Sequence, residues 1–202
     1  MTAAGKALLL AGLIASLTTN PAASAQDVTS TVSEFSSDTC PQVAKQDGEF
    51  LGGWLCTEGQ PMSIYFAEID LHQMTAFGTG AIHHCASRQT INGFNYADTS
   101  IEWRMKGGKP FAALQSWHVW WDADQRAEAK PFIVVTKIEA GNSCRVATVN
   151  AALTGAMTLA RRIADQRSQS FDCFKDVPAW LDAEGERKDQ STWNTPCAKT
   201  MP

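Results

Sequence analysis

The sequence lacks an excess of basic charge. Its 202 residues carry 17 Lys and Arg against 21 Asp and Glu, which gives a formal net charge of −4. A nucleic-acid-binding face needs clustered Lys and Arg, and a protein held to anionic lipid by charge needs the same. The composition therefore argues against nucleic acid as a partner and against a polybasic membrane-surface mode.

The familiar catalytic motifs are also missing. The sequence has no GxSxG elbow, HExxH pair, P-loop or dinucleotide fingerprint, and no C-x-x-C that would indicate a redox centre or a zinc knuckle. No cofactor and no metal are predicted on these grounds. A catalytic site assembled from distant residues leaves no such motif, so the absence favours a binding protein over an enzyme without deciding the matter.

The N-terminus has the pattern of a secretory signal peptide. Lys6 supplies a positive charge, residues 7–17 are apolar, and Ala23-Ser24-Ala25 is a small-residue cleavage site. The apolar run is too short for a stable membrane span, so we expect cleavage after Ala25 rather than an uncleaved anchor. This predicts a protein of the bacterial periplasm or secretome. Residues 26–39 are polar and rich in Ser and Thr, and are predicted to be a flexible lead-in.

The cysteines predict a disulfide framework. Six cysteines lie after the signal, an even number in an exported chain. A helix that returns antiparallel to the strand before it would bring Cys144 and Cys173 together. Cys40 and Cys56 are close enough in sequence for a second bridge, and elimination leaves Cys85 with Cys197. The predicted disulfide residues are Cys40, Cys56, Cys85, Cys144, Cys173 and Cys197.

Residues 131–171 carry the clearest local signals. Residues 132–138 and 144–149 are β-branched and apolar, and the turn residues between them predict an antiparallel hairpin. Asn150 is a candidate N-cap for an amphipathic helix that starts at Ala151. Residues 101–105 and 111–121 flank Gly107-Gly108 and predict a second hairpin.

With a further strand in residues 62–71, these segments predict an α+β fold. It is an antiparallel sheet of about five strands packed by one long C-terminal amphipathic helix and stapled by disulfides. The predicted organisation is a single domain over residues 40–202, with an irregular tail from about residue 174.

Two candidate sites contain histidine. If residues 62–71 form a strand that continues to His72, then Glu68, Asp70 and His72 share one face and can hold a metal ion or a general base. The alternative is the solvent face of a half-buried strand. The second candidate is His83-His84-Cys85, where adjacent histidines point to opposite sides and a disulfide at Cys85 would remove its thiolate.

The third candidate is the second hairpin, which is rich in tryptophan. Alternation along the strand puts Trp117 and Trp121 on one face and Trp120 on the other. One face must be core, and the question is whether the other is exposed, because exposed indoles can stack on sugar rings or anchor a protein interface. The predicted binding residues are Trp120, His118, Asp122 and Trp103.

These observations predict an exported soluble binding protein. It would contact a glycan, an envelope component or a partner protein, a hydrolase inhibitor among the possibilities, through the aromatic hairpin. The alternative function is a small metal-dependent or acid/base hydrolase that uses Glu68, Asp70 and His72.

Overall fold

The structure is a computed structural model, and it describes residues 1, 27–45, 47–48 and 50–197. Within these residues eleven strands form two sheets, and one α-helix, α1, spans Ala156–Arg167. The strands are β1 (Val28–Glu34), β2 (Gln42–Ala44), β3 (Phe50–Cys56), β4 (Ile64–Ile69), β5 (His72–Phe77), β6 (Phe94–Lys106), β7 (Lys109–Trp120), β8 (Lys130–Glu139), β9 (Asn142–Asn150), β10 (Ala179–Asp182) and β11 (Gly185–Lys188). Five 3₁₀ turns connect them: Ser37–Thr39, Ala81–His83, Cys85–Arg88, Ala123–Glu128 and Thr192–Asn194.

The larger sheet has the order β1-β6-β7-β8-β9-β10-β11. Its centre is the pair of predicted hairpins, β6–β7 and β8–β9. Gly107 and Gly108, with φ of 56° and 75°, make the turn of the first hairpin, where both residues need left-handed backbone. Only β10 pairs in parallel, with β9, because the chain crosses through α1 before it returns.

The helix covers one face of this sheet. The prediction that Asn150 caps a helix starting at Ala151 is wrong. Its Oδ1 accepts from the N–H of Ala152 at 2.9 Å, but this bond closes a turn after β9. The helix itself begins at Ala156, after Gly155 with φ of 72°. It buries Ala160, Ile163 and Ala164 against the sheet, and small side chains allow this close approach.

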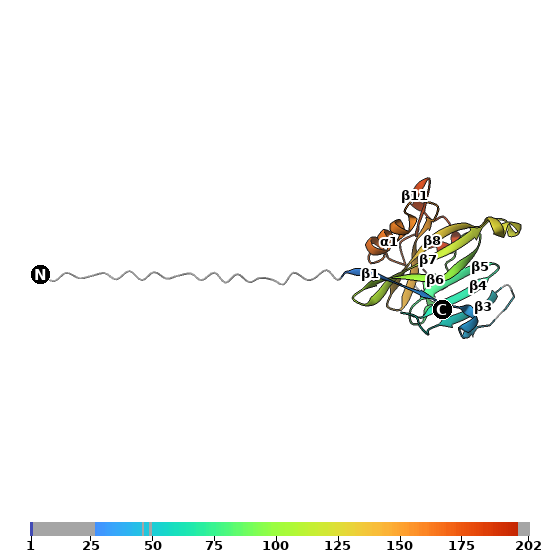
Figure 1. Ribbon diagram of the computed structural model, residues 1–202, viewed down its shortest axis with the longest axis horizontal. Coiled ribbons are helices and arrows are strands. Elements are labelled where there is room, and N and C mark those ends of the chain that lie inside the picture. Colours follow the sequence, from blue (N-terminus) through green and yellow to red (C-terminus); the bar gives the residue numbers. More distant parts are fainter. Residues whose placement is uncertain (2–26, 46, 49, 198–202) are drawn as a thin grey trace.

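The smaller sheet, β2-β3-β4-β5, covers the opposite face of β6 and β7. Trp103 from β6 is fully buried between the sheets and meets the ring of Phe77 edge-on at 5.4 Å. Ile64, Phe66 and Ala113 complete this core. The result is three layers, with α1 on one side of the large sheet and the smaller sheet on the other (Figure 1).

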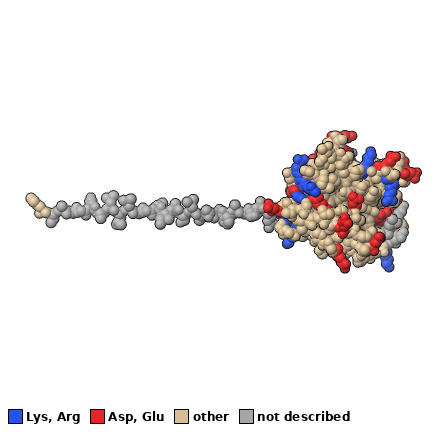
Figure 2. Space-filling model, viewed as in Figure 1, with Lys and Arg blue, Asp and Glu red and all other residues tan. Residues whose placement is uncertain are grey.

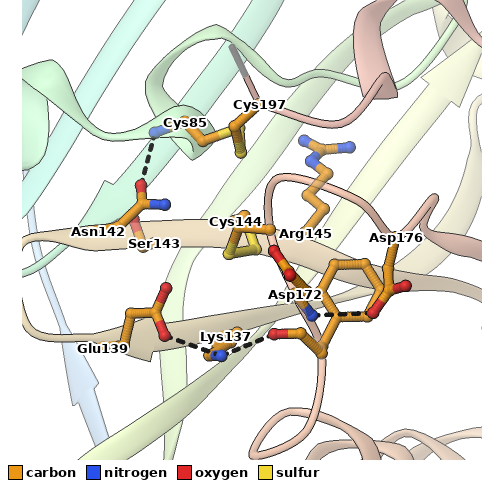
Figure 3. Close-up of a disulfide and its surroundings, with 12 residues drawn as sticks. Cys85, Lys137, Glu139, Asn142, Ser143, Cys144, Arg145, Asp172, Asp176 and Cys197 are labelled. Atoms are coloured by element: carbon orange, nitrogen blue, oxygen red, sulfur yellow. Dashed lines mark hydrogen bonds and ion pairs between the residues drawn. A yellow bond between two sulfur atoms is a disulfide. The ribbon is translucent and has the colours of Figure 1, made fainter. Parts of the chain in front are cut away.

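The six cysteines form the three predicted disulfides, Cys40–Cys56, Cys85–Cys197 and Cys144–Cys173. The last two lie side by side in one buried cluster, and Figure 3 shows the region where Cys144 on β9 lies near Cys85 and Cys197. The N–H of Cys197 also donates to the carbonyl of Cys173 at 2.8 Å. Three disulfides are typical of a protein that folds in an oxidising compartment.

The predicted fold class is wrong. The chain is mostly β, with two sheets of seven and four strands rather than one sheet of about five packed by a long helix. The lead-in expected to be flexible contains β1, which pairs with β6 although most of its side chains are exposed. The tail expected to be irregular contributes β10 and β11. These strands are polar or very short, so their backbone pairing leaves no hydrophobic alternation in the sequence. The predicted signal peptide lies outside the described residues, apart from Met1.

Candidate functional site

Glu68, Asp70 and His72 do not share a strand face, and that prediction is wrong. β4 ends at Ile69, and Asp70 and Leu71 form a tight turn with φ of 45° and 59° before β5 begins at His72. The Nδ1 atom of His72 lies 2.6 Å from the carbonyl oxygen of Asp70, and Glu68 accepts from Gln73. The turn contains no glycine, so the sequence of residues 62–72 gave no sign that the strand is interrupted. No group of three His, Cys, Asp or Glu side chains suited to a metal occurs in the described part of the chain.

The two adjacent histidines face opposite ways, His83 outward and His84 inward. His84 is buried, with Nε2 3.0 Å from the carbonyl oxygen of Thr79 and Nδ1 3.2 Å from Oγ of Ser143. Burial lowers the pKa of His84 below its ordinary value, although hydrogen bonds to backbone carbonyls oppose the shift. His84 therefore links β9 to the turn after β5 as a structural residue, and Cys85 is held in its disulfide.

The aromatic hairpin buries most of its tryptophans. Trp103 is fully buried and Trp120 is 3% exposed, so the expectation that they form a contact surface is wrong. Trp120 packs on the rings of Phe94 and Tyr96. The exposed indole is its neighbour Trp121, at 54%. Trp121 follows the last residue of β7, so the alternation of the strand does not govern its direction.

His118 and Asp122, the other predicted binding residues, make different contacts. His118 is partly exposed, stacks on Tyr96 at 4.6 Å and has Nε2 3.0 Å from a carboxylate oxygen of Asp98. An irregularity in β6 between Ala97 and Ile101 places Asp98 there. Asp122 instead accepts from the N–H of Asp124 and starts the following 3₁₀ turn.

The two candidate regions meet in one array of rings. His72, from the first candidate, packs between Phe94 and the exposed Trp193. Successive ring centroids are 4.6 to 6.1 Å apart along Trp193, His72, Phe94, Trp120, Tyr96 and His118. Close mutual packing of this kind fixes the end of the hairpin that carries Trp121.

A surface groove of about 460 Å³ lies beside Trp121, and we call it the indole groove. Its walls come from the loop before β6, the end of β7, and the strands and segment that follow α1. They are lined by Asn92, Trp121, Trp180, Arg187, Lys188, Asp189, Gln190 and Ser191. Segments nearly a hundred residues apart in sequence thus build one site.

Trp121 is held in the groove by a glycine. A Cβ atom on Gly93 would lie 2.9 Å from the carbonyl oxygen of Trp120 and 3.1 Å from Nε1 of Trp121, and the φ of Gly93 is +104°. Only glycine combines that backbone with so close an approach. On the other side, the ammonium of Lys130 lies 5.7 Å from the Trp121 ring centroid.

Trp180 forms the second indole of the groove. It packs on Phe132 with centroids 5.0 Å apart, and its Nε1 donates to Asp182 at 2.9 Å. The guanidinium of Arg187 lies 5.9 Å from its ring and pairs with Asp182 at 2.7 Å. Desolvation opposes ionisation of Asp182, but hydrogen bonds from Arg187, the backbone and Trp180 hold its pKa below the usual value.

Residues 188–197, which we call the C-terminal segment, are held by hydrogen bonds of two buried side chains. Asp189 is 8% exposed and accepts from the N–H of Ser191 and from Nδ2 of Asn194. Asn194 also donates to the carbonyl of Thr90 at 2.8 Å.

Arg145 is a buried cation whose pKa responds to the charge of Asp189. The guanidinium of Arg145 lies 4.4 Å from the ring centroid of Trp117. Burial lowers the pKa of Arg145 to about 9, while the charge of Asp189 works against that shift. Arg145 is therefore still a cation at neutral pH.

Sequence reasoning missed most of the groove. It named the hairpin but chose Trp120 over Trp121, and it had no reason to place Trp180 beside them. The two signals present were the Trp-Trp pair at the end of a strand and the Asn92-Gly93 turn.

No helix in the described part of the chain is long and apolar enough to cross a membrane. Models of known protein families, curated proteins and solved structures were compared with the chain, and none matches it.

Proposed function

We propose that this protein is an exported binding protein whose indole groove holds a glycan of the cell envelope. The observation that carries the proposal is the pairing of the exposed Trp121 with Trp180 in one groove. The C–H faces of sugar rings are apolar, so they pack on indole rings, while their hydroxyl groups need hydrogen-bond partners around the rim.

The rim of the groove offers the right polar groups. Asn92 and Gln190 carry amides, which both donate and accept, and Ser191 carries a hydroxyl. Phe132 packs on Trp180 and Gly93 lies close against Trp121, and contacts made before any ligand arrives reduce the entropy lost on binding. A sugar of one or two residues fits the volume of about 460 Å³.

The test is a binding measurement with a matched control. Purified exported protein is titrated with chitin oligosaccharides, solubilised peptidoglycan fragments and hexuronate oligosaccharides, and binding is followed by calorimetry. Trp121→Ala should weaken the binding at least about thirtyfold, since central tryptophans contribute roughly 2 kcal/mol or more. Phe174→Ala removes an aromatic ring that is 39% exposed but lies outside this groove, and this variant should bind as the natural protein does.

Two outcomes would count against the proposal. The first is that no glycan in the panel binds, and the second is that Trp121→Ala and Phe174→Ala weaken binding equally. Binding of an envelope protein in place of any glycan would support the other partner class expected from the sequence.

A further inference from the structure

Around the indole groove the acidic side chains are hydrogen-bonded within the protein, whereas two lysines form no ion pair with the described part of the chain. Asp122, next to Trp121, is exposed and accepts from the N–H of Asp124. Asp189 lines the groove and Asp182 pairs with the lining Arg187, and both of these carboxylates are already engaged. Asp189 is turned inward to Asn194 and the Ser191 N–H, and Asp182 accepts from Arg187 and Trp180. Neither carboxylate therefore offers a free acceptor to a ligand.

Two lysines beside the groove have no acidic partner. Lys188 is an exposed lining residue, and Lys130 is exposed with its ammonium over Trp121. Within the described residues the lysines that form ion pairs are Lys137 and Lys175, both elsewhere. The cations thus come from two separate elements, the end of β11 and the start of β8.

Two lysines outside any ion pair in the described residues thus lie beside one groove of a chain whose net charge is −4. Figure 2 shows acidic and basic side chains interspersed over the face that it presents, so charge of one sign does not dominate there. Unpaired cations beside exposed indoles attract a ligand that combines apolar ring faces with negative charge. Lysine ammonium groups suit this task in water, because they act as mobile point charges and do not require one fixed geometry.

We propose that the indole groove is selective for acidic glycans, with carboxylate-bearing sugars as the ligand class. The inference rests on the proposed function. Sugar rings lie against Trp121 and Trp180, and the carboxylates of the same or neighbouring sugars are met by Lys188 and Lys130. Selectivity then comes from charge, and the indoles contribute affinity to acidic and neutral sugars alike.

The test compares each acidic polymer with its uncharged counterpart. Oligosaccharides of polygalacturonate, alginate and hyaluronate are titrated beside the same oligosaccharides after reduction of their carboxyl groups to alcohols. We expect at least one acidic form to bind ten times or more tighter than its reduced form at low salt. That advantage should shrink several-fold between 20 mM and 200 mM salt, because exposed charges are screened.

Variants assign the effect to the two lysines. The double variant Lys130→Gln and Lys188→Gln should lose the preference for the acidic form and keep the affinity for the reduced form. A control double variant, Lys45→Gln and Lys109→Gln, removes the same charge from exposed positions that do not line the groove and should keep the preference.

The outcomes separate the two proposals. Equal affinity for acidic and reduced forms overturns the acidic preference but leaves glycan binding intact, as does binding confined to neutral sugars. A preference that survives in the Lys130/Lys188 variant also overturns the assignment. Failure of every glycan to bind removes the proposed function together with this inference.

Discussion

Loss of the Cys85–Cys197 disulfide should be the most destabilising of the three disulfide deletions. This bond joins residues 112 positions apart, against 29 for Cys144–Cys173 and 16 for Cys40–Cys56. On the loop-entropy account, closing such loops in the unfolded chain contributes about 4.8, 3.6 and 3.1 kcal/mol respectively at 25 °C. The double variant Cys85→Ser and Cys197→Ser should therefore lose about 5 kcal/mol of the free energy of unfolding.

Urea denaturation followed by tryptophan fluorescence measures that loss, with Cys40→Ser and Cys56→Ser as the matched control. The slope against urea should be compared as well, since removal of a cross-link expands the unfolded state. Hydrogen exchange should show the C-terminal segment losing protection before the sheet does, because without the disulfide it is held by a few hydrogen bonds and the stacking of Trp193 on His72. A smaller loss than in the Cys40/Cys56 control, with the segment still protected, would refute the reasoning.

Two further predictions concern buried charge. Burial lowers the pKa of His84 in the folded protein, so as the pH falls the imidazole is protonated in the unfolded chain before it is protonated in the folded one. Stability should therefore fall as the pH drops below the ordinary histidine pKa of about 6.5. Urea unfolding at pH 7.5 and 5.5 should show a loss that His84→Gln reduces, and an unchanged loss in that variant would contradict the assignment. Asp189→Asn removes a charge that favours the cationic form of the buried Arg145 and should lower the thermal stability, and Arg145→Met should recover part of that loss in the double variant. A neutral Asp189→Asn would show that the two charges do not interact.

The sequence identified the parts of the fold whose signals are local. The turns at Gly107-Gly108 and near Gly141 lie between largely apolar runs, and both hairpins form there. Asn150 was expected to cap the helix, but its side chain makes a turn at the end of β9 and the helix begins only at Ala156. The disulfides followed from parity, spacing and the return of a helix along its strand.

Other features left no local signal. Val28–Glu34 joins the large sheet through its backbone, although its polar and exposed side chains resemble those of a flexible segment. The turn at Asp70 and Leu71 has no glycine or proline, so one continuous strand was expected where two strands form. The turn separates Glu68 from His72, so the site predicted on a single strand does not form.

By itself the sequence determined the two hairpins and the presence of three disulfides, because each depends on residues close in the chain or on a count. Only the tertiary structure decided which indole is exposed and what lies beside it. Trp120 and Trp121 are chemically identical neighbours, and packing against Phe94 and Tyr96 buries one while the end of β7 exposes the other. Trp180 and Lys188 reach the same groove from the far end of the chain, through strand pairing that no local pattern records.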